Sequence, residues 1–309
     1  MRSFAPLSAL VTGSFAAYSD ALQNILMNTD RSEKYHYPTD FTREIVPKPF
    51  HSHNDYWRDV PFYTGLSYGA ISTEADVWLI NGTLYVGHEP SALTESRTLQ
   101  SLYIDPLLST LSRLNPSTPF RQEGEQNGVF DTSSGQTLYL FLDLKTSADE
   151  TWPAVLSALS PLRSGSWLTT FDGKERTNRP VTVIGTGNTQ LSDVQEYLPR
   201  DVFFDAPLSD LTNSLYANLT ANEAPIASTN FATQFGNMRS RKMNDTQIET
   251  LRRQIGDAHG KGIMARYWNQ PAWPIGTRNA IWRILWDEGV DLLNVDDLNG
   301  ASEFWEGSG

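Results

Sequence analysis

The stretch GAISTEADVWL, residues 69–79, decides the class of fold. It is a short, mostly apolar run of the length that predicts a β-strand. Side chains two residues apart in a strand point to the same side, so Glu74 and Asp76 share one face. Two carboxylates on one face of a strand place charge where a core is expected, which indicates a polar site near the end of this strand.

Seven further strand-like runs occur along the chain, and helix-like segments separate most of them. With the first stretch, the eight runs cover residues 48–54, 69–79, 137–145, 179–187, 201–207, 224–231, 261–269 and 290–298. Eight strands that alternate with helices predict an α/β fold, a single TIM-like (β/α)8 barrel. Only about a dozen residues follow the last run, so the last helix is expected to be short or missing.

The segments between the runs carry helix start and stop signals. Asp105 is expected to cap one helix, because a proline follows it and leucines then recur on one face. Asn244 or Asp245 is expected to cap a second helix. A third helix is predicted to open at Thr277 and to end at Gly289, directly before the last strand.

Composition limits what the chain can be. The 309 residues are 39% hydrophobic and 11% aromatic, which predicts a folded protein. The formal net charge of −12 argues against nucleic acid as a partner. The chain has no cysteine, which excludes thiolate nucleophiles and disulfides. No run of ~18 apolar residues occurs, so no membrane span is expected.

We expect three parts along the chain and a monomer. Residues 1–47 form an N-terminal extension, residues 48–300 the barrel, and residues 301–309 a C-terminal tail. The extension begins with Arg2, an apolar run and small residues, which is typical of a secretory signal. Polar residues dilute the apolar run, so a disordered arm is the alternative. The signal interpretation predicts a secreted protein or one of the secretory pathway.

Polar residues pair on three of the predicted strands. The pairs, each spaced by two positions, are His51 with His53, Glu74 with Asp76, and Asp143 with Lys145. Carboxylates this close repel each other strongly in a low-dielectric interior unless a cation lies between them. The three carboxylates are hard oxygen donors that suit one Mg²⁺ or Ca²⁺ ion at the mouth of a barrel. Solvated ends of edge strands are the alternative interpretation.

Other residues are expected near the same mouth. His88 follows a predicted hairpin turn at residues 81–82 and lies close in sequence to these pairs, although a structural role is its alternative. Arg266 and Trp268 share a face of the seventh strand, and Trp268 either stacks on a sugar or choline group or packs in the core. Further polar residues at strand ends are Asp205, Asn230 and Asp296.

Four segments together resemble the PLC-like phosphodiesterase superfamily. They are HSHNDYW (51–57), ISTEADVWLINGTLYVGHEPSAL (71–93), LDLKT (142–146) and GVDLLNVDDL (289–298). The superfamily includes glycerophosphodiester phosphodiesterases, sphingomyelinase D type phospholipases and PI-specific phospholipase C. The chain is most similar to a fungal group called altered inheritance of mitochondria protein six. The resemblance spans roughly residues 47–300 and implies a TIM-like barrel, a divalent cation and two catalytic histidines.

The resemblance assigns roles to residues of this chain. It implies His51 and His88 as the catalytic histidines and Lys145 as a catalytic cation, the metal ligands Glu74, Asp76 and Asp143, and Asn54 as a substrate-binding residue. Glycerophosphodiesterases carry arginine where this chain has Ser52. Phosphate binding is therefore expected to rely on Lys145, the metal and Arg266. His53 has no matching catalytic position, so we expect it to orient its neighbours or the substrate, with packing as the alternative.

The expected function is a metal-dependent phosphodiesterase that acts by two-histidine acid/base catalysis. Its substrate would be a small-molecule or lipid phosphodiester, either a glycerophosphodiester or a (lyso)phospholipid-like compound. One of His51 and His88 would deprotonate the attacking hydroxyl or act as the nucleophile, and the other would protonate the leaving group. Attack by a substrate hydroxyl gives a cyclic phosphate, whereas attack by water gives a monoester, and both remain open.

Two other functions fit the same residues. A non-catalytic barrel could bind a sugar, inositol or lipid head group through its tryptophan-rich mouth. A barrel lyase or isomerase could use the same metal on a carboxylate substrate, with Lys145 as the base.

Overall fold

The computed structural model describes residues 19–29, 32–122 and 124–304, which fall into two compact units, Met1–Pro38 and Thr39–Gly309. The first unit contains helix α1 (Asp20–Thr29). The predicted secretory signal lies almost entirely outside the described residues, as do residues 305–309 of the predicted tail. The expected boundaries at residues 47 and 300 stay predictions.

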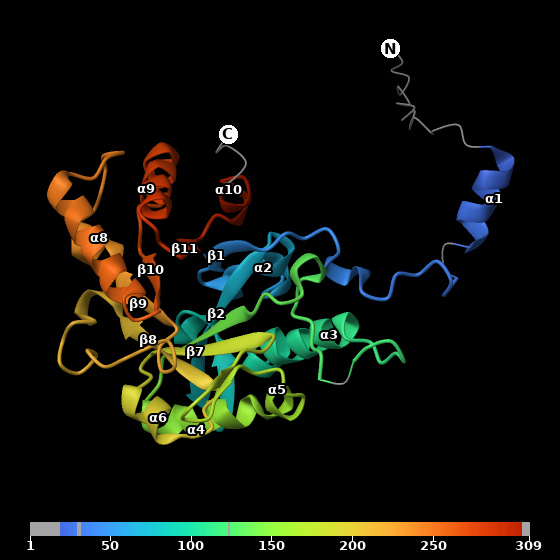
Figure 1. The fold of residues 1–309 in the computed structure, drawn as a ribbon, viewed down its shortest axis with the longest axis horizontal. Helices are drawn as coiled ribbons and strands as arrows, with labels where there is room; N and C mark the ends of the chain where they lie inside the picture. Colours follow the sequence, from blue (N-terminus) through green and yellow to red (C-terminus); the bar gives the residue numbers. More distant parts are fainter. Residues whose placement is uncertain (1–18, 30–31, 123, 305–309) are drawn as a thin grey trace, which may run out of the picture. The chain divides into compact units, whose positions relative to one another are not determined.

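The second unit is a closed barrel of eight parallel strands (Figure 1). In chain order its strands are β1 (Lys48–Ser52), β2 (Ala70–Ile80), β4 (Leu138–Leu144), β7 (Val181–Gly187), β8 (Val202–Pro207), β9 (Ile226–Asn230), β10 (Met264–Trp268) and β11 (Leu292–Val295). Each strand pairs in parallel with the next, and β1 pairs with both β2 and β11, which closes the barrel. The predicted TIM-like barrel is confirmed, and each of the eight predicted runs coincides with one of its strands to within a few residues at each end.

One hairpin extends the barrel beyond its rim. Strand β3 (Thr83–Val86) pairs antiparallel with the second half of β2. The two residues between these strands, Asn81 and Gly82, have φ values of 50° and 80°. Such a two-residue turn matches the twist of the two strands, so the predicted hairpin turn is confirmed. A smaller hairpin, β5 (Thr170–Phe171) with β6 (Arg176–Thr177), forms a separate sheet.

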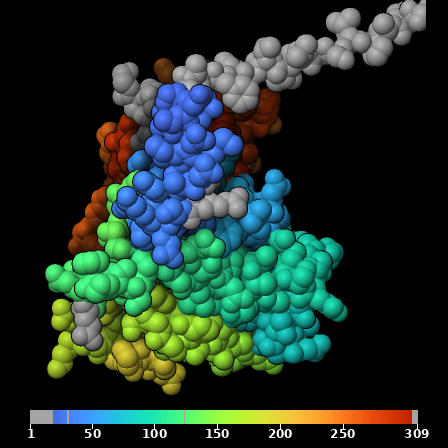
Figure 2. Space-filling view, turned by 90° about the vertical axis from the view of Figure 1, so that its right-hand side faces the viewer, coloured from blue at the N-terminus to red at the C-terminus, as the bar shows by residue number. Residues whose placement is uncertain are grey.

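Helices surround the strands (Figure 1). They are α2 (Tyr63–Ser67), α3 (Asp105–Leu114), α4 (Ala148–Ala158), α5 (Ser160–Ser164), α6 (Leu191–Glu196), α7 (Phe231–Phe235), α8 (Asp245–His259), α9 (Ile275–Asp287) and α10 (Leu298–Ser302). Figure 2 shows one face of the unit, where the teal α3 region and the yellow-green α4–α5 region lie at the surface. The helix after β11 has five residues, so the short last helix is confirmed. Within the ranges described, no helix is both long and apolar enough to span a bilayer.

The predicted helix starts were partly wrong. Asp105 does not cap α3, because residues Gln100–Ile104 already form a π-helical turn that runs into it. The Asp105 carboxylate instead accepts a hydrogen bond from the Gln100 side chain. Asn244 does cap α8, and its side chain and that of Gln247 form a reciprocal capping box.

Helix α9 also starts earlier than predicted and ends close to the predicted residue. It begins at Ile275, directly after Pro274, so Thr277 lies inside its first turn. The Thr277 hydroxyl donates to the Arg239 carbonyl instead of capping the helix. The helix ends at Asp287, and Gly289 then adopts a φ of 96°, a left-handed conformation that favours glycine after a helix.

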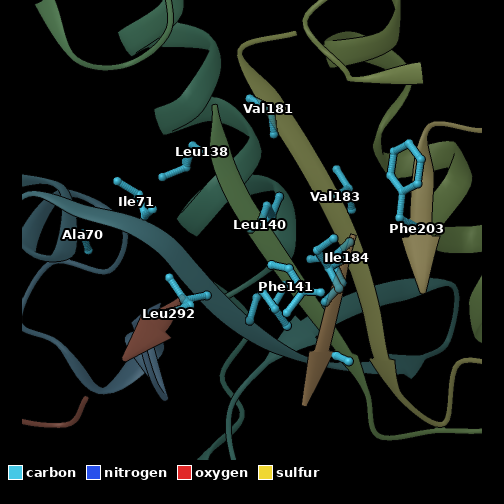
Figure 3. Close-up of a cluster of buried hydrophobic side chains, with 14 of the residues drawn as sticks. Ala70, Ile71, Leu138, Leu140, Phe141, Val181, Val183, Ile184, Phe203 and Leu292 are labelled. Carbon is cyan, nitrogen blue, oxygen red and sulfur yellow. The ribbon is translucent and has the colours of Figure 1, made fainter. Parts of the chain in front are cut away.

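The barrel interior changes from apolar to polar along the strand direction. Phe141, Ile184 and Phe203 are register partners on three adjacent strands and therefore face the same side (Figure 3). Two residues further along β4 and β7, toward the carboxyl ends of the strands, Asp143 and Thr186 are register partners on that same side. The polar site thus lies at the carboxyl ends of the strands, above an apolar layer.

Candidate functional site

Three carboxylates meet at this end of the barrel. Ligand atoms of Glu74 and Asp76 on β2 and of Asp143 on β4 all lie within 4.8 Å of one another. Glu74 and Asp76 are buried, and Asp143 Oδ1 has no hydrogen-bond partner among the described residues. A buried cluster of hard oxygen donors with an unpaired oxygen fits a divalent cation such as Mg²⁺ or Ca²⁺. The predicted metal ligands therefore form a group that could hold one ion.

A glycine lets the neighbouring strand approach this cluster. Gly187 ends β7 with a φ of 65°, and a Cβ atom built there would lie 1.9 Å from Asp143 Oδ1. Any larger residue at this position would push Asp143 away or unwind the end of the strand. The cluster therefore depends on Gly187, which the sequence did not single out.

The electrostatics of the cluster show unbalanced negative charge. Burial, and then the charges of Glu74 and Asp143, raise the pKa of Asp76 to about 6, against the opposing effect of Lys145. Burial also raises the pKa of Asp143, although the Lys145 ammonium opposes it. A bound cation would relieve this repulsion, which is the electrostatic condition for a metal site.

Lys145 already supplies one positive charge. Its Nζ lies 2.8 Å from Asp143 Oδ2 and 3.0 Å from Asp76 Oδ2. Burial alone would lower the pKa of Lys145, but the two carboxylates raise it overall, so the side chain is an ammonium at neutral pH. Three carboxylates and one ammonium leave two negative charges, which a divalent ion would balance.

His53 lies at the mouth beside the cluster. Its Nδ1 is 2.7 Å from Asp296 Oδ1 on the adjoining end of β11, and its Nε2 is 3.9 Å from Glu74 Oε2. The side chain is 22% exposed, so solvent and ligands reach it. Arg58 fixes both strand ends, because its guanidinium donates to the carbonyls of His53 and Asp296. His53 thus presents Nε2 to the carboxylate cluster and Nδ1 to the Asp296 carboxylate.

His51 lies one layer deeper in the barrel. Its side chain is fully buried, with Nδ1 2.7 Å from Ser72 Oγ and Nε2 3.5 Å from Glu74 Oε2. Burial and the nearby Arg266 guanidinium lower the pKa of His51 to about 3, so the imidazole is neutral at neutral pH. Burial alone would raise the pKa of Glu74, but the hydrogen bond with His51 and the positive charge of Arg266 lower it. His51 thus contacts the Glu74 carboxylate from the interior of the barrel.

Arg266 also lies in the barrel interior. Its guanidinium donates to Asn294 Oδ1 at 3.2 Å and Ser228 Oγ at 2.9 Å, and it stacks over the Phe141 ring. The residue is 3% exposed. These interior partners already engage its side chain. The contact of Arg266 with substrate phosphate that the sequence suggested stays a prediction.

His88 lies beside Asp76 in the cluster. Its Nδ1 is 3.3 Å from Asp76 Oδ2 and 3.1 Å from the Tyr56 hydroxyl, and nearly half of the side chain is exposed. The Tyr56 hydroxyl donates to Asp76 Oδ2 at 2.7 Å and also lies 2.5 Å from Asn54 Oδ1. The backbone N–H of Asn54 donates to Glu74 Oε2. The predicted residues His88 and Asn54 therefore both contact the carboxylate cluster.

Sequence reasoning missed Tyr56. Burial and the nearby Asp76 carboxylate raise its pKa well above the usual range, so it stays a protonated donor. The residue lies within HSHNDYW, but a tyrosine next to a tryptophan gives no sign that it will turn inward. Only the 3₁₀ turn Asp55–Trp57, which follows a left-handed Asn54, directs the phenol to the cluster.

Trp268 lies at the end of β10 and is 38% exposed. It lines a pocket of about 600 Å³ together with Asp205 and Ser228 on the neighbouring strands. Asn230, at the end of β9, caps α7 by accepting from the Thr233 N–H. Trp268 thus lies at a cavity beside the carboxylate cluster, whereas Asn230 is engaged in local structure.

Fold and site together define a class: a TIM barrel with a buried acidic cluster and histidines at the carboxyl ends of its strands. A family model described as the AIM6-like phosphodiesterase domain matches residues 39–205. The chain is 54% identical over 300 residues to the altered inheritance of mitochondria protein 6 homolog of Arthroderma benhamiae, with 94% of each chain covered. It is 36% identical over 280 residues to altered inheritance of mitochondria protein 6 of Eremothecium gossypii, covering 85% of this chain and 71% of the relative.

A protein of the same name from Saccharomyces cerevisiae strain RM11-1a is 34% identical over 313 residues, covering 92% of this chain and 79% of the relative. The chain belongs to the AIM6-like phosphodiesterase family. The resemblance predicted from the four sequence segments is therefore confirmed, and a phosphodiesterase is the enzyme class that the family description names.

Proposed function

We propose that the chain is a divalent-cation-dependent phosphodiesterase that cleaves a glycerophosphodiester or a (lyso)phospholipid-like phosphodiester. One observation carries the proposal. The buried carboxylate cluster has two solvent-accessible histidines beside it, with His53 3.9 Å from Glu74 and His88 3.3 Å from Asp76. A phosphodiester at this cluster would have an imidazole available both to remove one proton and to donate another.

An ion held by Glu74, Asp76 and Asp143, either Mg²⁺ or Ca²⁺, would neutralise charge on the phosphoryl oxygens. Lys145 keeps two of these carboxylates in place and adds a further positive charge at the same point. Together these charges favour the developing negative charge of the transition state.

We assign the general base to His53. The Asp296 carboxylate accepts from Nδ1–H of His53, which leaves Nε2 free to take a proton from the attacking hydroxyl. The sequence interpretation shared the acid and base roles between His51 and His88 without saying which residue took which role. The complete burial of His51, and the contacts of both its ring nitrogens, support a positioning role for it under Glu74.

We assign the general acid to His88. Its exposed ring lies beside Trp57, with the ring centroids 5.3 Å apart, and contacts the Tyr56 hydroxyl. These contacts hold the imidazole over Asp76, from where it can protonate the leaving alkoxide. A binding protein without catalysis would have no use for two exposed histidines held in this way.

The test is a comparison of metal-free and metal-loaded protein on a panel of glycerophosphodiesters and lysophospholipids. The metal-free protein, prepared with EDTA, is expected to be inactive and to regain turnover with Mg²⁺ or Ca²⁺. Head-group binding that ignores EDTA, together with no turnover in either metal, would instead identify a non-catalytic binding barrel. Sugar acids in the same panel test the lyase or isomerase alternative.

A further inference from the structure

A pocket of about 600 Å³ opens beside the carboxylate cluster, and the mechanism above does not use it. It lies at the ends of β7, β8, β9 and β10, and its lining includes Thr186, Asp205, Ser228, Tyr216 and Trp268. Thr186 is the register partner of Asp143, and the adjacent lining residue Gly187 packs on the Asp143 carboxylate. A group bound in this pocket would therefore be next to a phosphate held at the cluster. Volumes of this size suit small-molecule ligands.

The lining residue Asp205 carries an unused hydrogen-bond acceptor. The Asp205 side chain is only 6% exposed, yet its Oδ1 meets no donor in the part of the chain that the structure describes. The other oxygen, Oδ2, accepts from Thr186 Oγ1 at 3.1 Å and lies 3.8 Å from the Arg266 guanidinium. A buried acceptor without a donor costs free energy, so a ligand that donates a hydrogen bond there would gain by binding.

The walls combine hydroxyls, amides and aromatic rings. Phe204 and Tyr216 stack nearly in parallel, and Trp268 presents a partly exposed ring. Hydroxyl and amide groups come from Thr186, Thr189, Gln190, Ser192, Gln195 and Ser228. Among the described residues that form this lining, none is a lysine or arginine, which argues against a phosphate subsite. Aromatic faces for C–H groups beside many hydrogen-bonding groups suit a polyol.

We propose that this pocket binds the polyol that the phosphate joins to the glycerol or lyso-lipid part of the substrate, such as inositol or a sugar, with Asp205 Oδ1 accepting a hydrogen bond from one of its hydroxyls. The proposal rests on the proposed function, because that function places a phosphodiester at the neighbouring cluster. A quaternary ammonium head group has no N–H or O–H to offer, so it would leave Asp205 Oδ1 without a donor.

The test compares two substrates that differ in head group, glycerophosphoinositol and glycerophosphocholine, in the metal-loaded protein. The wild type is expected to favour the inositol compound, mainly through a lower KM. Asp205→Asn replaces the charged acceptor with a neutral amide, so the hydrogen bond from the inositol hydroxyl weakens and the ratio of the two kcat/KM values should fall about tenfold. Asp210→Asn is the matched control, because the same change is made on an exposed aspartate outside the pocket.

Thr186→Val is a second variant, because it removes the hydroxyl that holds Asp205 without changing the charge. It should lower the same ratio. Turnover of both substrates with a ratio that neither variant changes would overturn the pocket proposal and leave the proposed function intact.

If the wild type cleaves no phosphodiester, the proposed function fails, and calorimetry then tests the pocket by itself. If glycerophosphoinositol binds the EDTA-treated protein and Asp205→Asn weakens this binding at least tenfold, the result supports the pocket proposal. Absence of such binding, or equal binding by the variant, would overturn it.

Discussion

His53 Nδ1 lies 2.7 Å from Asp296 Oδ1, and this pair joins the ends of the first and last barrel strands at the mouth. A carboxylate on one ring nitrogen fixes the orientation and tautomer of a histidine and leaves the other nitrogen for chemistry. A second pair of the same type, His259 with Asp291, joins the end of α8 to the start of β11. It provides a matched control for changes at the mouth.

Replacement of His53 should abolish most of the activity without unfolding the protein. His53→Ala is expected to lower kcat by about 10²–10⁴-fold, the usual contribution of a general base. His259→Ala should keep the wild-type rate. Steady-state kinetics and thermal melts of both variants check this, and a His53→Ala enzyme that turns over like the wild type would rule out our assignment of the base.

His51→Ala should behave differently, because His51 is buried. The variant leaves a cavity and removes the hydrogen bond to Ser72, so we expect a loss of about 2–4 kcal/mol in the free energy of unfolding. Urea unfolding measures this loss. A variant with unchanged stability and no activity would return the catalytic role to His51, as the sequence interpretation had it.

Asp296→Asn should slow the reaction through His53. Loss of the orienting carboxylate is expected to lower kcat about 10–100-fold and to shift the pH profile, while KM changes little. Asp291→Asn is the control at the second pair. The pH dependence of kcat is measured for both variants. If Asp296 has a purely structural role, Asp296→Asn lowers kcat but its pH profile keeps the wild-type shape and position.

Metal affinity should fall in mild acid. Asp76 has a pKa of about 6 without metal, so below this pH a proton must leave before the carboxylate can bind a cation. The Kd for Mg²⁺ or Ca²⁺ is therefore expected to rise by up to about tenfold per pH unit below pH 6. Calorimetric titrations at pH 5 and pH 7 measure the change, and equal Kd values would contradict Asp76 as a ligand.

Gly187→Ala should damage the metal site through the backbone. The added Cβ would meet Asp143 Oδ1 at 1.9 Å, and the positive φ adds strain, so stability should fall by about 1–3 kcal/mol and metal binding should weaken. Gly124→Ala is the control, because Gly124 also has a positive φ but no described atom lies within 4 Å of its added Cβ. Equal metal affinity in the two variants would show that the close approach to Asp143 is unimportant.

Asp205 should make the folded protein less stable as pH rises. Its pKa in the folded state is raised from 3.8 to about 6, mainly by burial, so the folded state holds the proton more tightly than the unfolded state. Its contribution is greatest below pH 3.8 and declines by about 3 kcal/mol as pH rises through 6. In metal-free protein, the stability of Asp205→Asn relative to the wild type should therefore increase between pH 4 and pH 7. A difference that does not change with pH would refute this.

The sequence predicted the strands and which side chains share a face, because both follow from local spacing. Glu74 and Asp76 meet Asp143 as expected, since parallel strands bring their carboxyl ends together. The sequence could not predict how deep in the barrel each of these side chains lies. His51 and His53 share a face of the β1 run, and only the register of His51 with Ser72 and Asn294 shows that His51 lies in the interior.

Other misses have similar causes. Asp105 has the local features of a helix cap, but the residues before it already continue the helix. Asp205 was expected at the mouth, but the unpaired state of its Oδ1 depends on which donors four different strands supply. Such features arise from contacts between residues far apart in the sequence, so spacing within one segment carries no sign of them.

In the proposed function, the carboxylate cluster binds the cation needed to cleave a phosphodiester. Phosphorus NMR of a glycerophosphodiester mixed with the metal-loaded wild type, the EDTA-treated wild type and the metal-supplied Asp143→Asn variant tests it most directly. We predict a new phosphomonoester or cyclic phosphate signal in the first sample and an unchanged spectrum in the other two. The same product signal in all three samples, or in none, would contradict the claim.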